Sequence, residues 1–177
     1  YLSDKLDFIM YFHDSIRDSD KAEDIKKYLE PDKNADNSSY ARVDIHSSFE
    51  LITWGGLKPE IITEIIPSIV EIYPDIASIT LKYMVRISDS GKQKLYEVKE
   101  YYRVRYTPDR MYLLNYERSM EELFDPNLES SDGIMKLGIT ADNRVPYLIS
   151  ADKKKLAFVR SRQLWFYDLD ADELVRV

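Results

Sequence analysis

The two histidines, His13 and His46, are the side chains best suited to ligate a metal or to move a proton near neutral pH. A zinc site needs more imidazole or thiolate ligands than two histidines supply, and the chain has no cysteine. His13 lies on the apolar side of a helical pattern, and His46 lies on the polar side of an alternating pattern. We therefore expect structural or solvated roles for both, and the sequence predicts no metal site.

An acidic run near the C-terminus has part of the spacing of a calcium loop. Its members are Asp168, Asp170, Asp172 and Glu173. The loop glycine and the distant bidentate glutamate are absent, so a solvated turn is expected. The chain also lacks a nucleophile elbow, a phosphate-binding loop, a dinucleotide fingerprint and the HExxH motif. The sequence thus predicts no catalytic residue and no cofactor, and it favours a non-catalytic role.

Tyrosines and arginines are concentrated between residues 95 and 118, where the pattern alternates as in a β-strand. Alternation places some of them together on one sheet face, and both residue types carry much of the binding energy at interfaces. The predicted binding residues, for a protein or a glycan partner, are Tyr96, Tyr102, Arg103, Arg105, Tyr112 and Arg118. The other interpretation is that the tyrosines only cover a two-layer sheet.

Helices are expected in the first part of the chain, where apolar residues recur at steps of three and four. The first two predicted helices span residues 3–17 and 21–29. Residues 60–73 place large apolar side chains opposite glutamates, which predicts a third helix, interrupted at Pro67. These helices would form one layer of the fold.

From residue 79 onward the pattern changes to alternation. Three long strands are predicted, over residues 79–87, 95–106 and 111–118. A strand over residues 42–51 precedes them, and a short helix over residues 119–124 follows them. The predicted fold class is α+β, with N-terminal helices packed on an antiparallel β-meander.

Short strands separated by polar turns are predicted at the C-terminal end. The clearest are Lys155–Arg160 (KLAFVR) and Gln163–Asp168 (QLWFYD), with two residues between them. Together with the preceding turn at Ser150 and Asp152, and with Leu169 after the second strand, this segment resembles one blade of a TolB-like or WD40-like β-propeller.

The resemblance covers residues 147–177, and a lysine, Lys153 or Lys154, stands where the family usually has a turn glycine. One blade cannot close a propeller, which needs about four. The resemblance therefore implies a first blade of a propeller that continues beyond Val177. The other interpretation is an ordinary β-meander of an α+β domain.

A change in composition near residue 130 predicts a domain boundary. Residues 1–130 are predicted to form the α+β domain, and residues 131–177 the β-meander that resembles a propeller blade. Asn127–Gly133 (NLESSDG) is the predicted linker, and Gly133–Thr140 (GIMKLGIT) is expected to begin the β-only region.

The net charge of −7 disfavours a nucleic-acid backbone or an anionic membrane as partner. No run approaches the length and apolarity of a membrane span. We expect an interaction or sensing module of a larger bacterial cell-surface protein, located outside the cell, with a cytoplasmic location left open. The alternative is part of a hydrolase whose active site is completed by a propeller outside these residues. A third interpretation is a regulatory ectodomain of a membrane kinase.

Overall fold

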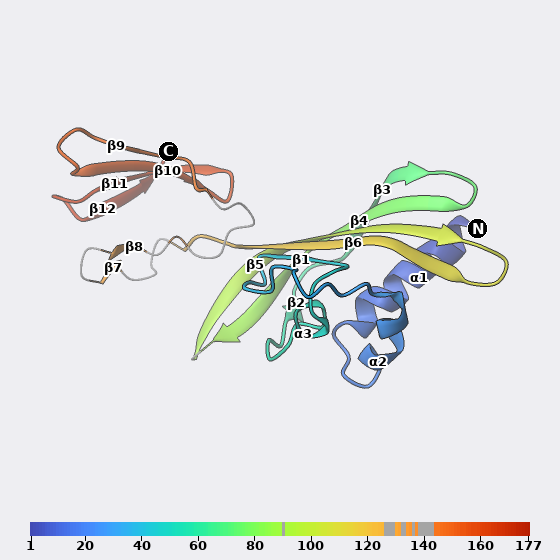
Figure 1. Ribbon diagram of the computed structural model, residues 1–177. Coiled ribbons are helices and arrows are strands. Elements are labelled where there is room, and N and C mark those ends of the chain that lie inside the picture. Colours follow the sequence, from blue (N-terminus) through green and yellow to red (C-terminus); the bar gives the residue numbers. More distant parts are fainter. Residues whose placement is uncertain (90, 126–129, 132–133, 136, 138–143) are drawn as a thin grey trace. The chain divides into compact units, whose positions relative to one another are not determined.

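The computed structural model describes residues 1–89, 91–125, 130–131, 134–135, 137 and 144–177. The chain forms two compact units, Tyr1–Met120 (unit 1) and Glu121–Val177 (unit 2). Helices stand at the N-terminal end and antiparallel strands follow, so the predicted α+β class is confirmed (Figure 1). The predicted linker Asn127–Gly133 and the predicted start of the β-only region, Gly133–Thr140, lie mostly outside the described residues, and the boundary near residue 130 stays a prediction.

Short helical elements precede the main sheet of unit 1. They are α1 (Leu2–Ser15), α2 (Ala22–Ile25), the 3-10 turn η1 (Lys26–Tyr28) and α3 (Phe49–Ile52). The first two predicted helices are confirmed in position. None of the helices in the described part of the chain has the length and apolarity to cross a membrane.

The sheet of unit 1 is antiparallel, with the strand order β1-β6-β5-β4-β2 and with β3 also paired to β4. Its strands are β1 (Arg42–Asp44), β2 (Glu60–Ile61), β3 (Ile66–Ile72), β4 (Ile76–Asp89), β5 (Lys92–Tyr106) and β6 (Met111–Glu122). The three long predicted strands are therefore confirmed. β4 and β5 form one hairpin whose register runs from Ile76 opposite Arg105 to Asp89 opposite Lys92.

The helix predicted over residues 60–73 is wrong, because β2 and β3 occupy this segment. Its isoleucines and valine are β-branched and suit a pleated strand. Pro67 would interrupt a helix, but an edge strand tolerates it. β4 pairs with β3 from Ile66 opposite Lys82 to Ile72 opposite Ala77.

Two shorter predictions are also corrected by pairing and capping. The strand predicted over residues 42–51 ends at Asp44, because the Ser48 side chain accepts from the Leu51 amide and caps α3. The helix predicted over residues 119–124 is absent, because β6 continues to Glu122, with Ser119 opposite Arg42 of β1.

The core of unit 1 lies between α1 and one face of the sheet, which we call the inner face. α1 contributes Ile9, Phe12 and the following Ile16, all nearly inaccessible to solvent. On the sheet side the inner-face residues of β4 and β5 are buried, and they are Ala77, Ile79, Leu81, Tyr83, Val85, Ile87, Tyr96, Val98, Glu100, Tyr102 and Val104. Ser78 and Thr80, at the intervening positions of β4, are buried as well. All three helices lie on the same side of the sheet in Figure 1. The intervening side chains, at even-numbered positions of β4 and odd-numbered positions of β5, form the outer face.

Unit 2 contains a four-stranded antiparallel sheet in the order β12-β11-β10-β9 and a small pair, β7 (Ser130–Ser131) with β8 (Ile134–Met135). The four strands are β9 (Tyr147–Ile149), β10 (Lys155–Arg160), β11 (Gln163–Asp168) and β12 (Glu173–Arg176). The two clearest predicted strands are confirmed at their predicted bounds. The turn between them places Ser161 at φ 50° and Arg162 at φ 61°, which is the backbone that a two-residue hairpin of matched twist requires.

Candidate functional site

The six residues predicted to bind a partner are divided between the two faces of the sheet. Tyr96, Tyr102 and Arg118 are buried in the core, at 5%, 0% and 1% exposure. They point inward because their strands place them in line with other core residues. Arg103, Arg105 and Tyr112 remain half-buried at the surface. The predicted binding face is therefore reduced to these three residues, and the other three lie in the core of unit 1.

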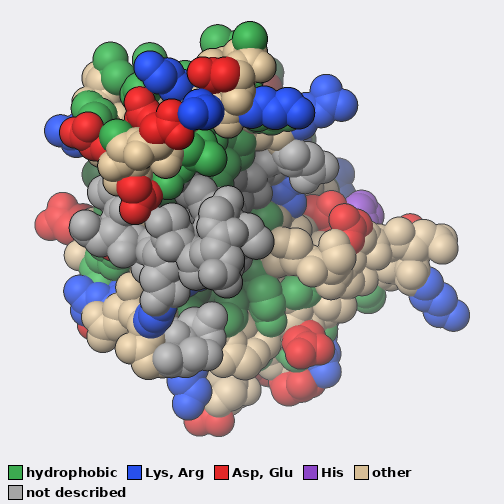
Figure 2. All heavy atoms as spheres, turned by 90° about the vertical axis from the view of Figure 1, so that its left-hand side faces the viewer, with side chains coloured by type: hydrophobic (Ala, Val, Ile, Leu, Met, Phe, Trp, Pro, Cys, Tyr) green, Lys and Arg blue, Asp and Glu red, His purple; other side chains and the backbone are tan. Residues whose placement is uncertain are grey.

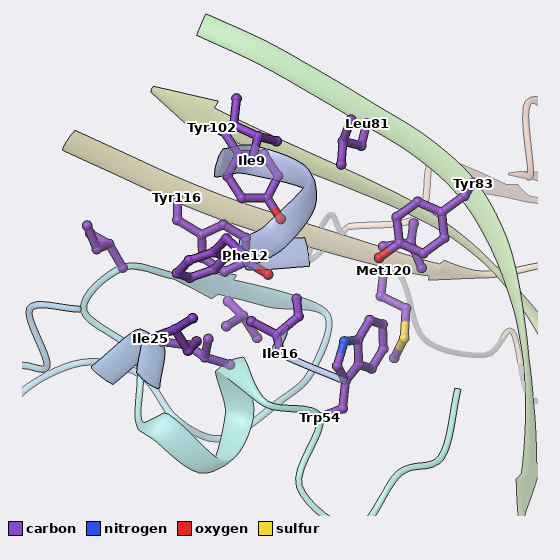
Figure 3. Packing of buried hydrophobic residues seen from close by; sticks show 14 of the residues in the cluster. Ile9, Phe12, Ile16, Ile25, Trp54, Leu81, Tyr83, Tyr102, Tyr116 and Met120 are labelled. Atoms are coloured by element: carbon purple, nitrogen blue, oxygen red, sulfur yellow. The ribbon is translucent and has the colours of Figure 1, made fainter. Parts of the chain in front are cut away.

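Glu100 is the middle of a polar centre in this core and is fully buried on β5. Its Oε2 lies 2.7 Å from Nδ1 of His13 on α1 and accepts from the Tyr102 hydroxyl at 2.8 Å. Its Oε1 accepts from the Tyr83 hydroxyl of β4 at 2.8 Å. We call these four residues the Glu100 network. It ties the helix layer to both central strands of the sheet, and Figure 3 shows the hydroxyls of Tyr83 and Tyr102 turned toward each other.

Burial and hydrogen bonding shift the pKa of Glu100 in opposite directions. Burial alone would raise the pKa of Glu100, but the hydrogen bond and charge of His13, the charge of Arg118 and the Tyr83 hydrogen bond outweigh it and lower that pKa. Burial, followed by the Glu100 charge, raises the pKa of Tyr83 and of Tyr102 well above the usual value. Glu100 is therefore an ionised carboxylate, and the phenols of Tyr83 and Tyr102 beside it are neutral.

Arg118 on β6 lies at the next part of the same core. Its guanidinium donates to the carbonyl oxygens of Leu51 and Ile52, at 2.7 and 2.9 Å, and stacks 3.7 Å from the centre of the Trp54 ring. It thus binds the carboxyl end of α3, where cations are stabilised. Four buried polar atoms here have no hydrogen-bond partner among the described protein groups: His13 Nε2, Tyr116 Oη, Trp54 Nε1 and Arg118 Nε. Internal water is the usual partner of such atoms.

The outer face presents a different chemistry, with arginines around one tyrosine. The guanidinium carbons of Arg105 and Arg110 lie 5.0 and 4.0 Å from the centre of the Tyr112 ring. Within the described residues neither arginine has a carboxylate at ion-pair distance, and Arg105 Nε is buried without an acceptor. Arg103, in contrast, pairs with Glu71 of β3 at 2.7 Å. Arg105, Arg110 and Tyr112 form what we call the arginine cluster.

Two lysines lie further along the same face. Lys82 of β4 stands directly opposite Lys99 of β5, and both are exposed. In the part of the chain that the structure describes, neither forms an ion pair. Like charges directly across a sheet destabilise it, so this pair costs the fold some stability. The neighbouring charges are Glu97, opposite Met84, and the Arg86–Glu60 ion pair at 3.0 Å.

β3, at the edge of this sheet, exposes large apolar side chains. Ile66, Ile69, Val70 and Ile72 are each more than half exposed, as is Tyr73 directly after the strand. Tyr73 closes the hairpin by donating its amide to the Ile76 carbonyl at 2.7 Å. The register pairs Ile66 with Lys82 and so places it on the outer face, whereas Ile69 and Ile72 pair with Ile79 and Ala77 of the inner face. The outer face therefore combines cations, the Tyr112 ring and the apolar side chain of Ile66.

The remaining sequence candidates have ordinary protein partners. His46 is exposed, with Nδ1 2.8 Å from the Glu30 carbonyl oxygen. In the acidic run, Asp168 and Asp170 pair with Lys155 and Lys154, at 3.9 and 2.9 Å. No group of three or more potential metal ligands comes together among the described residues. On the face drawn in Figure 2, basic and acidic side chains are interspersed, with hydrophobic ones between them.

Sequence reasoning missed Glu100 and the Lys82–Lys99 pair for different reasons. Glu100 had a visible signal, because it is the one acidic residue in line with Tyr96, Val98 and Tyr102. The lysine pair had none, since only the strand register puts the two residues opposite each other. Comparisons of this chain with protein-family models, with curated proteins and with solved structures found no match.

Proposed function

We propose that this chain is an interaction module that binds a protein or glycan through the outer face of the unit 1 sheet. The observation that carries the proposal is the arginine cluster, in which Arg105 and Arg110 stack on Tyr112 without a carboxylate partner among the described residues. Arginine and tyrosine in such an arrangement are the residue types that most often dominate binding energy. The exposed Ile66 of β3, opposite Lys82, extends the same surface.

The Glu100 network fits a structural role within this proposal. Its carboxylate is fully buried and already accepts from three side chains, so it anchors α1 to the sheet. The hydrolase alternative, with a site completed outside these residues, stays a prediction. The same holds for the predicted location outside the cell and for the predicted propeller.

The proposal is tested by comparing two double variants of the full chain as immobilised baits. Arg105→Ala/Tyr112→Ala removes the centre of the arginine cluster. Tyr11→Ala/Lys33→Ala removes an exposed tyrosine and an exposed lysine elsewhere on unit 1. Partners recovered from extracts of the producing cells are quantified by mass spectrometry.

We expect a partner that the unmodified chain and the control variant retain, and that the cluster variant loses by about tenfold or more. Identical recovery by all three baits would contradict the proposal. Circular dichroism of both variants checks that they remain folded.

A further inference from the structure

On β3, β4 and β5, the part of the outer face between the rows of Ile76 and Lys82 has the opposite sign to the charge of the whole chain. The chain carries −7, yet the rows from Ile76 to Lys82 present Lys82, Lys99, Arg103 and Arg105 against one acidic residue, Glu71. Glu71 is already neutralised by Arg103 at 2.7 Å. Arg110 adds a further cation beside Tyr112. A local positive field of this kind attracts acidic partners selectively.

The free cations are grouped at two places, and the register fixes their separation. The arginine cluster lies in the row of Ile76 opposite Arg105, and the lysine pair lies in the row of Lys82 opposite Lys99. Ile76 and Lys82 are six residue steps apart along β4, which corresponds to about 20 Å. An extended peptide of about seven residues spans the same distance.

The surface between and beside the two cation groups suits a polypeptide. The half-buried Tyr101 lies between the groups, opposite the buried Thr80, and the exposed Ile66 of β3 continues the row of Lys82. Tyr73, about half exposed, lies at the other end of β3. A nucleic acid or an acidic glycan would leave these apolar side chains uncovered. A protein segment with apolar residues covers them and gains hydrophobic burial.

Resting on the proposed function, we infer that the partner of the outer face is an acidic segment of another protein. Its carboxylates pair with the arginine cluster at one end and with the lysine pair at the other, and its apolar residues cover the flank at β3. The Lys82–Lys99 repulsion is relieved when a carboxylate binds between the two ammonium groups.

The test uses a synthetic nine-residue peptide with two glutamates at each end and with valine and threonine between them. One control peptide has lysines in place of the glutamates, and a second has the same composition with its four glutamates adjacent. Binding to the full chain is measured by fluorescence anisotropy, at low and at physiological ionic strength. Heparin fragments, a DNA duplex and vesicles containing phosphatidylserine are titrated in parallel.

We expect the spaced acidic peptide to bind at least about tenfold more tightly than either control, with an affinity that falls as salt is added. Lys82→Glu/Lys99→Glu and Arg105→Glu/Arg110→Glu are each expected to weaken it by about tenfold or more. Lys21→Glu/Lys33→Glu makes the same change in net charge on other exposed lysines, and it is expected to leave the affinity within about twofold.

Equal binding of the three peptides, or equal loss in all three double variants, would overturn the inference. Tighter binding of heparin, DNA or vesicles through the same residues, without binding of the spaced peptide, would also overturn it and assign the face to that class. Failure of the peptide, together with a cellular partner that depends on the arginine cluster, would reject the acidic segment and leave the proposed function standing. Failure of both experiments would reject both.

Discussion

At the scale of single residues, Glu100 is the most constrained side chain in unit 1. It is a buried carboxylate with three hydrogen-bond donors, which come from α1, β4 and β5. Taking a charge out of water is costly unless such donors compensate. The network therefore stabilises the fold only while all of its members are present.

Glu100→Gln is expected to lower the free energy of unfolding by about 3 kcal/mol or more, because the amide nitrogen cannot accept from His13 or Tyr102. Glu97→Gln makes the same change on the same strand, at an exposed position of the outer face. It is expected to change stability by less than about 0.5 kcal/mol. Urea denaturation followed by tyrosine and tryptophan fluorescence compares the two, and similar midpoints would refute the role given to Glu100.

The same residue sets a pH dependence whose sign follows from its lowered pKa. Because the folded state holds the Glu100 pKa below its unfolded value, the ionised carboxylate stabilises the fold above that unfolded value, about pH 4.3. This stabilisation is lost as the pH falls through the folded pKa. We expect the unmodified chain to lose stability below about pH 4.3 more steeply than Glu100→Gln does. Parallel stability curves for the two proteins between neutral and acidic pH would exclude this contribution.

At the scale of secondary-structure elements, strand pairing determined the structure of residues 60–73, which the local sequence pattern did not. The run from Glu60 to Tyr73 has apolar spacing compatible with a helix, but β4 offers it a strand partner and its β-branched residues suit that partner. Lys5 adds a long-range effect, since its buried ammonium donates to the carbonyls of Tyr73 and Pro74, at 2.9 Å each, and fixes the turn after β3. Neither contact has a signal in the sequence near these residues.

Alternation, in contrast, located β4, β5 and β6 correctly because a half-buried strand imposes its period directly on the sequence. It did not say which of the two alternating sets faces α1. The choice depends on the packing of α1, whose Phe12 lies against Tyr102 and Tyr116 with ring centres 5.8 and 5.3 Å apart (Figure 3). The predicted binding set mixed the two faces, since Tyr102 and Arg103 are adjacent on β5 and point to opposite sides whichever one α1 covers.

The hairpin of β4 and β5 carries a prediction of its own at Lys99. Lys99→Glu replaces a like-charged cross-strand pair by an ion pair with Lys82, and is expected to stabilise the chain by about 0.5 kcal/mol. The same variant is expected to weaken binding of the spaced acidic peptide. Lys99→Gln, which removes only the repulsion, is expected to give a smaller gain. Thermal unfolding of the three proteins measures the order, and a loss of stability in Lys99→Glu would show that the two lysines do not repel each other.

At the scale of the whole molecule, the two units differ in how completely they cover their own apolar surface. In unit 2, Phe124 packs against Phe158 and Trp165, with ring centres 5.4 and 5.0 Å apart, and so covers one face of the sheet. The register aligns Leu148, Ala157, Phe166 and Val175 in one row of the opposite face. Leu148 is 77% exposed and Val175 is 44% exposed. A sheet with two apolar faces needs a layer on each side, and the resemblance to a propeller blade proposes a further sheet as that layer.

Unit 1 supplies all of the residues of its own hydrophobic core, so we expect it to fold without unit 2. Every residue of the main buried cluster, from Ile9 to Met120, belongs to unit 1. A fragment of residues 1–130 contains this whole cluster together with the Glu100 network and the outer face. We expect it to unfold in one cooperative transition and to retain the amide NMR spectrum that residues 1–120 have in the full chain. The fragment of residues 121–177 serves as the comparison, and its uncovered row is expected to bind a hydrophobic dye or to self-associate. If residues 1–130 show no cooperative transition while the full chain does, the boundary near residue 130 is misplaced and the two units fold as one.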